Sequence, residues 1–359
     1  MATDRRFDVP DSLAVRIPAD DMCATAAALF ASLDMSDEHA ARAADVLVYA
    51  DLRGIDSHGV SNMFPFYVQW LSSGFLNPRP SPSVVRQAPA AVTIDDDRGL
   101  GLATSHDAMA EAISRARQYG VGSVAVTNSG HFGAAAYWAG MALDHDMIGL
   151  AVTVGGLQVA PTHGARAMVG LNPIAVAAPA GKEAPFIFDA SMSSVAGNKI
   201  RIARRLGAKV APGWIARPDG TPIMEESEVP DDFLMLPLGG TREIGSHKGY
   251  SLAVVVDILS GVLSGTGPGF LHSREVSHHF TAWRIDAFRD PDEFKADMDV
   301  FLRGLRECPP APGAERVLYA GLAEWETLQD RKQRGIPYHP DVVEWFRRTC
   351  AERGAACLV

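Results

Sequence analysis

Apolar residues at helical spacing fill the first part of the chain. Segments 19–33 and 37–52 each predict a helix with one apolar face, and Ser36 stands at the N-cap position of the second. The proline-rich stretch 77–82 predicts a linker or an extended crossing. The pattern therefore predicts a helical N-terminal region that ends near residue 85.

Beyond this stretch, short apolar runs alternate with helical segments. The runs predict strands at residues 91–94, 121–126, 148–154, 174–178, 186–188 and 280–285. Helices are predicted at 105–119, at 291–306 and at 250–263, which is apolar enough that we expect it to be buried. The last fifty residues combine a proline-rich turn with short helical pieces. We predict an α/β or α+β fold with a helical lobe built from the N-terminal region and the C-terminus.

Composition narrows the classes of function. A chain of 359 residues has room for two or three domains, or for one large core with an added lobe. Its 47% hydrophobic and 21% charged content is typical of a folded globular protein. The net charge of −10 argues against nucleic acid as a partner, because phosphate binding depends on an excess of Lys and Arg. An anionic substrate would need specific cations to hold it.

Nothing in the sequence predicts a membrane segment or a disulfide framework. No apolar run reaches the ~18 residues that a spanning helix needs, and the N-terminus lacks the apolar core of a secretory signal. Cys23, Cys308, Cys350 and Cys357 are scattered without a CxxC pair. We expect a cytoplasmic protein.

Two histidines lie in short polar segments framed by glycine. His58 lies in the segment 51–59 at the end of a predicted helix, and His131 lies in the segment 128–133 after a predicted strand. A neutral imidazole with a pKa near ~6.5 can donate or accept a proton at physiological pH. The pair indicates an enzyme that transfers protons. The alternatives are a solvated His58 at a helix end and a buried His131 bonded to a backbone carbonyl.

Ser57 and Asp56 beside His58 could suggest a nucleophilic triad. We do not predict one, because adjacent Ser and His side chains rarely point at each other and no G-x-S-x-G elbow is present. Positioning of a substrate or of a cofactor ring is the role that we predict for His58.

The turn with Gly99 and Gly101 invites a Rossmann interpretation, which we reject. Thr104 occupies the third glycine position, and the acidic segment 95–97 lies where a pyrophosphate would need positive potential. A tight turn between a strand and a helix is the prediction.

Other polar residues follow strands or open helices. Asp189 could accept hydrogen bonds from a ribose or a carboxamide, or cap the next segment. Lys248 could complete an anion site at a helix start, or be a solvated lysine. Arg274 could bind a carboxylate with both guanidinium nitrogens. His278 and His279 have no acidic partner at ligand spacing, so we predict no metal site.

These motifs occur in one order over roughly residues 15 to 340: R-G-x-D-S-H-G, S-G-H-F-G, G-x-N-P, F-D-A-S and H-K-G-Y-S-L-A. The chain thereby resembles the malate/L-lactate dehydrogenase family. The resemblance implies reduction of 2-oxo acids, or of the corresponding imines, with NADH or NADPH as the cofactor. It also implies a non-Rossmann nicotinamide-binding α/β domain, a homodimer and no metal.

The resemblance implies a role for each matching residue. His131 would be the catalytic acid/base, with His58 and Ser57 orienting the substrate. The residues implied in cofactor binding are Asn172, Asp189, Ala190, Ser191, Lys248 and Gly249. Arg274 and Gly155 match substrate-binding positions, and we also predict Arg53 and Tyr67 at the substrate. Residues 1–85 with 290–359 would form the helical substrate lobe, and residues 86–289 the cofactor-binding domain.

One departure bears on the substrate. Many members carry an arginine shortly after S-H-G, but the segment 60–67 contains no cation. Either Arg53, Arg274 or Lys248 takes over, or the substrate differs at that end. The apolar side chains of Met63, Phe64 and Phe66 indicate a larger or less charged substrate.

We predict hydride transfer between NAD or NADP and a 2-oxo acid/2-hydroxy acid pair. The alternatives are an imine reductase, acting on cyclic imino acids or making N-alkyl amino acids, a non-catalytic binding protein, and a metal-dependent hydrolase using His278 and His279.

Overall fold

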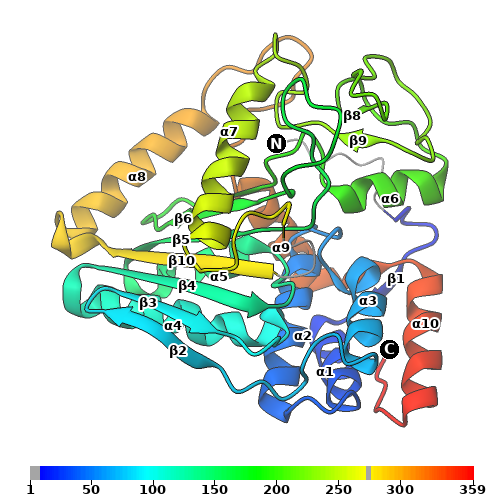
Figure 1. Ribbon diagram of the computed structural model, residues 1–359, viewed down its shortest axis with the longest axis horizontal. Coiled ribbons are helices and arrows are strands. Elements are labelled where there is room, and N and C mark those ends of the chain that lie inside the picture. Colours follow the sequence, from blue (N-terminus) through cyan, green and yellow to red (C-terminus); the bar gives the residue numbers. More distant parts are fainter. Residues whose placement is uncertain (1–8, 272–275) are drawn as a thin grey trace.

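A seven-stranded mixed sheet forms the centre of the molecule (Figure 1). The structure, a computed structural model, describes residues 9–271 and 276–359. In spatial order the strands are β2 (Ser83–Ala88), β3 (Ala91–Asp95), β4 (Val121–Ser129), β10 (Val276–Arg284), β5 (Met147–Thr153), β6 (Ile174–Ala178) and β7 (Phe186–Ala190). Only β3 and β4 pair in parallel within this sheet. All six predicted strands are confirmed, and the order confirms a non-Rossmann α/β fold.

Helices cover both faces of the sheet. Helix α4 (Gly101–Tyr119) lies on one face together with α5 (Ala135–Gly140), and α7 (Ser246–Val256) lies on the other (Figure 1). The turn before α4 is tight, as predicted, with the Gly99 amide donating to the Asp96 carbonyl at 2.8 Å. A Cβ on Gly101 would lie 2.5 Å from the Gly130 carbonyl oxygen, so this glycine lets α4 approach the end of β4.

A second group of helices comes from the two ends of the chain (Figure 1). It comprises α1 (Ala19–Ala31), α2 (Asp37–Leu52), α3 (Val60–Ser72), α9 (Leu322–Arg334) and α10 (Pro340–Arg353). Strand β1 (Val15–Ile17) pairs antiparallel with β11 (Ile336–Tyr338) and thus joins the two ends. Ser36 caps α2, as predicted, by accepting a hydrogen bond from the His39 amide at 3.2 Å.

One hydrophobic core runs from these helices into the sheet. The rings of Phe30 and Phe64 lie 4.4 Å apart, and Phe346 of α10 packs edge-on against Phe64. The same core continues to Trp138 and to Phe280 of β10. A smaller core lies around α6 (Gly197–Leu206), β8 (Ile215–Ala216) and β9 (Leu234–Met235). No helix in the described part of the chain is long and apolar enough to cross a membrane.

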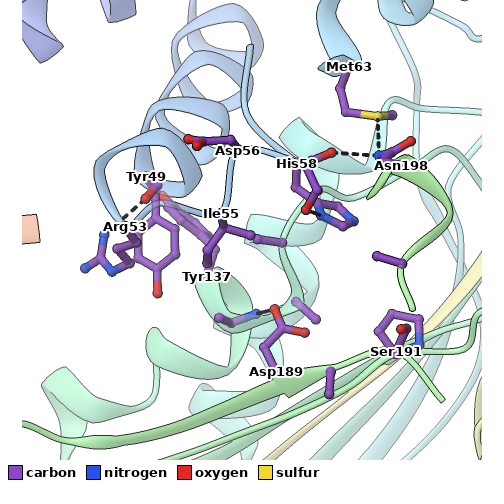
Figure 2. A pocket seen from close by; sticks show the side chains of 18 of the residues that line it. Tyr49, Arg53, Ile55, Asp56, His58, Met63, Tyr137, Asp189, Ser191 and Asn198 are labelled. Carbon is purple, nitrogen blue, oxygen red and sulfur yellow. Dashed lines mark hydrogen bonds between the residues drawn. The ribbon is translucent and has the colours of Figure 1, made fainter. Parts of the chain in front are cut away.

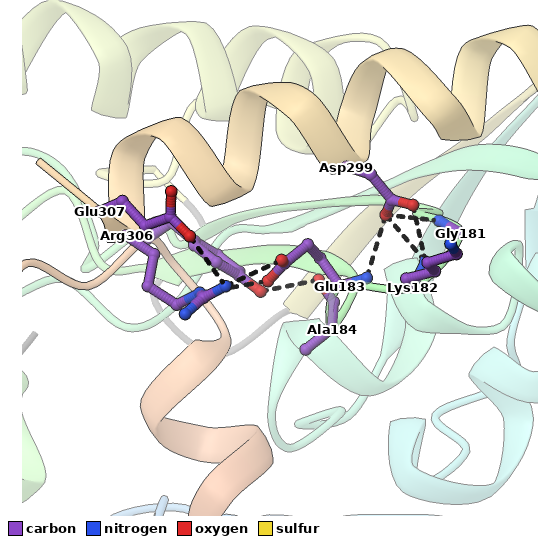
Figure 3. A network of polar contacts seen from close by, with 8 residues as sticks. Gly181, Lys182, Glu183, Ala184, Asp299, Arg306 and Glu307 are labelled. Carbon is purple, nitrogen blue, oxygen red and sulfur yellow. Dashed lines mark hydrogen bonds and ion pairs between the residues drawn. The ribbon is translucent and has the colours of Figure 1, made fainter.

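Helix α8 (Pro291–Arg306), confirmed at its predicted bounds, lies apart from α1, α2 and α10 (Figure 1). It instead holds the turn between β6 and β7 (Figure 3). The Asp299 carboxylate accepts hydrogen bonds from the amides of Gly181, Lys182 and Glu183 at 2.8–3.0 Å. Arg306 pairs with Glu183 at 3.0 Å.

Three expectations about the helices need correction. The segment 250–263 is buried on one face only, since Ala253 and Val256 are fully buried whereas Ile258 is 52% exposed. It forms α7 followed by a π-helix, η3 (Asp257–Val262). Helix α3 was not predicted, because Pro65 lies within it. The C-terminal pieces are two helices of 13 and 14 residues.

Gly149 tests the packing of α5 on β5. A Cβ at this position would lie 2.1 Å from the Ala139 carbonyl oxygen, so Gly149→Ala should lower the free energy of unfolding by about 1–3 kcal/mol. Gly304→Ala is the matched control, because Gly304 lies in α8 with nothing within 4 Å of the added Cβ. It should stabilise the protein by roughly 0.5–1 kcal/mol. Urea unfolding measures both, and equal effects would contradict the close approach.

Candidate active site

A deep cleft of about 2200 Å³ holds most of the residues singled out in the sequence. Its walls include the turn before α3, the segment after β4, the end of β7 and the start of α6. His58 projects toward the strand end that carries Asp189 and Ser191 (Figure 2). Arg53 and Tyr49 lie at the other end of the view from His58 and Asn198 (Figure 2).

His58 lies in the turn between α2 and α3. Its Nδ1 is 2.9 Å from the Ser57 hydroxyl, so the expectation that these adjacent side chains point apart is wrong. Asp56 does not complete a triad, because its carboxylate pairs with Arg331 at 2.8 Å. Desolvation by the surrounding protein lowers the pKa of His58 to about 4, which leaves the ring neutral at pH 7.

His131 follows β4 and lines the same cleft. Its Nδ1 is 2.8 Å from the Tyr67 hydroxyl and 3.3 Å from the Gly133 amide, which donates to it. An amide can only donate, so Nδ1 is the acceptor and the neutral ring carries its proton on Nε2. At Nδ1 the ring is thus satisfied by a hydroxyl and an amide, and not by the backbone carbonyl of the alternative prediction. Burial, and then His58 and His278, lower the pKa of His131 to about 3.

The two rings meet although 73 residues separate them in the chain. Their centroids lie 5.9 Å apart, with the planes tilted by only 13°. His58 comes from the helical group, whereas His131 comes from the end of a sheet strand. The fold thus places two neutral imidazoles side by side on one wall of the cleft, where a substrate oxygen or nitrogen can meet a proton donor.

A buried polar chain lies behind His131. His278 of β10 approaches the Gly130 carbonyl oxygen at 3.1 Å through Nε2 and the Thr153 hydroxyl at 2.8 Å through Nδ1. Ser129 bonds to His278 and donates to Asp96 at 2.6 Å. His278 is thus occupied within the sheet. Among the described residues, no group of three or more His, Cys, Asp or Glu side chains could hold a metal ion.

The end of β7 presents polar groups to the opposite side of the cleft. Asp189, Ala190 and Ser191 all line it, and the Asp189 carboxylate accepts a hydrogen bond from the Ala136 amide at 2.8 Å. Desolvation of the Asp189 carboxylate by the surrounding protein raises its pKa to about 6. Gly155 also lines the cleft, and its amide donates to the Asn172 side chain at 3.2 Å.

Other residues expected at the cofactor lie outside the cleft lining. Asn172 is fully buried and donates to the Ala253 carbonyl at 2.9 Å, so it supports Gly155 from behind. Lys248 and Gly249 open α7 beyond the residues that line the cleft. A Cβ on Gly249 would lie 2.3 Å from the Leu238 carbonyl oxygen, which indicates close packing. Arg274 lies outside the described residues.

Comparison with known proteins agrees with this geometry. A family model described as malate/L-lactate dehydrogenase matches residues 17–347. Malate dehydrogenase of Pyrococcus abyssi is 38% identical over 92% of each chain. L-sulfolactate dehydrogenase of Methanocaldococcus jannaschii is 34% identical, covering 89% of this chain and 91% of that protein. The solved malate dehydrogenase of Pyrococcus horikoshii OT3 superposes with a TM-score of 0.89 at 33% identity, covering 97% and 98% of the two chains.

The chain belongs to the malate/L-lactate dehydrogenase family. It is an oxidoreductase, and its relatives are named dehydrogenases of hydroxy acids. Membership in a dehydrogenase family implies a nicotinamide cofactor. The structure is consistent with the missing arginine after S-H-G. Asn62 donates to the Asp56 carbonyl at 2.7 Å, and α3 offers no cation to the cleft.

The side chains of α3 divide between two environments. Met63 and Phe66 line the cleft, as the substrate hypothesis requires. Phe64 does not, since it is fully buried in the core, and its predicted role at the substrate is wrong. Tyr67, expected to bind substrate, is also fully buried and contacts His131 instead. The Arg53 guanidinium lies 3.5 Å from the centroid of the Tyr49 ring at the edge of the cleft.

Asn198 is a site residue that sequence reasoning missed. Its amide nitrogen donates to the Ser57 carbonyl at 2.6 Å and lies 3.2 Å from the Met63 sulfur (Figure 2). This contact fastens the start of α6 to the turn that carries His58. The sequence feature that could have indicated Asn198 is the Gly-Asn-Lys segment at 197–199, which opens a helix as the segment 245–248 does.

A buried carboxyl group supports the same turn from below. Asp51 Oδ2 accepts hydrogen bonds from the Val60 amide at 3.0 Å and from the Tyr338 hydroxyl at 2.8 Å, while Oδ1 has no partner. A Cβ on Gly59 would lie only 1.6 Å from Oδ1, so the S-H-G glycine is required for this carboxyl to fit. Burial raises the pKa of Asp51 to about 7.

Asp51→Asn should change how stability depends on pH. The folded state binds a proton on Asp51 more tightly than the unfolded state does, because the pKa rises from 3.8 to about 7 on folding. The stability that this proton gives is complete below pH 4 and is lost as the pH rises through 7. As the pH rises from 5 to 8, the free energy of unfolding of the variant should therefore increase by up to about 2–4 kcal/mol relative to that of the wild type. Urea unfolding at both pH values measures this, and a constant difference would contradict it.

Proposed function

We propose that the protein reduces a 2-oxo acid to a 2-hydroxy acid with NADH or NADPH, and that it catalyses the reverse reaction with the oxidised cofactor. The observation that carries the proposal is the pair of stacked, neutral histidines in one cleft. His131 presents Nε2–H to the cleft, and His58 lies beside it with Ser57 at its Nδ1. Membership in the malate/L-lactate dehydrogenase family supports the reaction class.

The cleft suits a dinucleotide together with a small substrate. Its volume of about 2200 Å³ exceeds the roughly 300–1,000 Å³ that a single small ligand usually occupies. Asp189 and Ser191 could hydrogen-bond the cofactor, with Gly155 leaving room beside it, since a Cβ there would meet nothing closer than 4.0 Å. A bound reduced nicotinamide supplies the hydride that the carbonyl carbon accepts.

In this mechanism, the protein's own part is to deliver a proton. Nε2–H of His131 donates a hydrogen bond to the carbonyl oxygen, where negative charge develops during the reaction. The negative charge of a bound 2-oxo acid offsets the desolvation that keeps the free ring neutral, so the ring can take up a second proton. The Tyr67 hydroxyl can donate to Nδ1 of the neutral ring and accept from the protonated one. It therefore holds the ring in place in both states.

Residues 1–85 with 290–359 would form the helical substrate lobe, and residues 86–289 the cofactor-binding domain, which also contributes His131 to the substrate site. The positions of His58 in the first part and of Asp189 in the second support this division. Helix α8 is the element that fits it least, since it contacts the turn between β6 and β7.

Oxidation of NADH and of NADPH, followed by absorbance, tests the proposal with 2-oxo acids of graded size. Each acid is assayed with and without methylamine, and a cyclic imino acid is assayed beside them. Turnover with 2-oxo acids alone is the expected result. Turnover confined to the imino acid or to the amine mixtures would instead establish the imine reductase, which remains an alternative prediction.

His131→Asn should lower kcat for the best 2-oxo acid by about 10²–10⁴-fold while the protein remains folded, because the proton donor is lost. His106→Gln, on the outer part of α4, is the matched control and should leave kcat unchanged. Unchanged turnover of His131→Asn at saturating cofactor would remove His131 from the mechanism.

A homodimer is also proposed, on the strength of an exposed apolar stripe. Leu252 and Val255 of α7 and Ile258 and Val262 of η3 are 42–52% exposed at helical spacing. Isolated proteins rarely leave such a continuous apolar row open to water, and a second copy of the chain can cover it symmetrically.

Ile258→Asp should therefore yield a monomer, because a charge would be buried at the centre of that interface. Light scattering coupled to gel filtration measures the mass of the wild type and of the variant. Val300→Asp, at an exposed position on α8, is the control. A variant that keeps the wild-type dimer mass, or a monomeric wild type, would contradict the proposed interface.

A further inference from the structure

Helix α6 places an arginine without an ionic partner in the cleft. Arg201 lines the cleft, and its described contacts are the Phe66 ring, whose centroid lies 4.9 Å away, and the Asn198 side-chain oxygen at 3.4 Å. No carboxylate among the described residues pairs with it. A guanidinium held by an aromatic face and an amide keeps most of its donors free for a ligand.

The neighbouring helix α3 explains why this cation matters. Helix α3 contains no Lys or Arg, and the position four residues after His58 is Asn62, which is bonded to the Asp56 carbonyl. The substrate therefore meets the apolar side chains of Met63 and Phe66 along this helix. A negative group on that part of the substrate would have to find its counter-charge on a different element.

Helices α3 and α6 face each other in matched register. Asn198 contacts Met63, and one turn further along both helices Arg201 contacts Phe66. Asn198 also bonds to the Ser57 carbonyl, which places the first of these pairs beside His58. Phe66 lies six residues, or about 9 Å of helical rise, beyond the start of α3. Arg201 thus stands at the end of the cleft wall away from the reacting centre.

Among the described residues, most other cations of the cleft already have partners. Arg16 pairs with Asp11 at 2.9 Å, Arg331 with Asp56 at 2.8 Å and Arg334 with Asp330 at 3.3 Å. The Arg53 guanidinium also lies on an aromatic ring, that of Tyr49, but at the other end of the view from Asn198 and Met63 (Figure 2). Lys199 remains, but residues two positions apart on a helix do not face the same way, so Lys199 and Arg201 present their charges in different directions.

We propose that Arg201, supported by Phe66 and Asn198, binds an acidic group at the distal end of the substrate and so selects 2-oxo diacids over 2-oxo acids with neutral chains. This inference rests on the proposed function and names the residue that sets its substrate class. A distal carboxylate can accept two parallel N–H hydrogen bonds from the guanidinium, which a neutral chain of the same length cannot.

Kinetics with chain-matched substrates test the proposal. 2-Oxoglutarate and 2-oxopentanoate have five carbons each and differ in the distal carboxylate, as oxaloacetate and 2-oxobutyrate do with four. Arg201→Gln should lower kcat/KM for the diacids by about 10- to 100-fold, mainly through KM, and leave the neutral acids within about threefold. Arg201→Lys should recover only part of the loss, since its ammonium cannot form the paired bonds.

Two variants on the same helix serve as controls. Arg204→Gln removes the same charge one turn further on, at a side chain that donates to the Pro230 carbonyl and does not line the main cleft. It should not change the preference. Lys199→Gln should not reproduce the loss seen with Arg201→Gln. An equal loss for diacids and neutral acids in Arg201→Gln, or a matching loss in Arg204→Gln or Lys199→Gln, would overturn the proposal.

A binding measurement separates failure of this inference from failure of the proposed function. Glutarate and pentanoate carry no oxo group and are titrated calorimetrically into wild type and Arg201→Gln. Glutarate should bind the wild type at least tenfold more tightly than the variant, and pentanoate should bind both alike. If no acid were reduced with either cofactor, the proposed function would fail, while this difference would still support Arg201 as the carboxylate site. Equal binding of glutarate to both proteins would overturn the inference alone.

Discussion

The hydrogen bond between the Tyr67 hydroxyl and Nδ1 of His131 joins the helical part of the molecule to its sheet. At 2.8 Å it connects a fully buried residue of α3 with the segment that follows β4. It sets the orientation of the ring and leaves Nε2 as the nitrogen that faces the cleft. Because His58 lies in the turn before the same helix, this contact helps to set its position relative to His131.

Buried polar groups maintain that junction on both sides. Asp51 holds the turn before α3, and the chain from Asp96 through Ser129 to His278 holds the end of β4. Burying such groups costs free energy unless each finds a partner. These buried hydrogen bonds fix the positions of the two segments, because a shift of either segment would leave several donors and acceptors unpaired. One atom of this network, Oδ1 of Asp51, is buried without a hydrogen-bond partner.

Much of the sheet could be predicted from the sequence, because apolar runs and helical spacing are local signals. Helix α8 was found at its bounds for the same reason, with Asp290 as a cap and Pro291 in the first turn. The glycines around His58 and His131 marked both as site residues. Helix α3 was missed because Pro65 argues against a helix, and without the helix the cleft-facing Phe66 could not be told from the buried Phe64.

Contacts between distant segments could not be predicted. Nothing local in Tyr67 or His131 shows that they bond across 64 residues. The exposed face of α7 and η3 was expected to be buried, since apolar composition alone does not say which faces of a helix the core covers. Arg201 gave no signal because its significance comes from Phe66 on another helix. Local pattern thus identified the two histidines that meet in the cleft, whereas their partners could be found only from the fold.

The most direct test of hydride transfer to a 2-oxo acid follows the hydrogen itself. The enzyme is supplied with reduced nicotinamide that carries deuterium on the transferring face of ring carbon 4, together with the 2-oxo acid that it turns over best. The account predicts a 2-hydroxy acid with one deuterium on carbon 2, detected by mass spectrometry and by loss of the proton resonance at that carbon. A 2-hydroxy acid with hydrogen from solvent at carbon 2, or no 2-hydroxy acid at all, would contradict it.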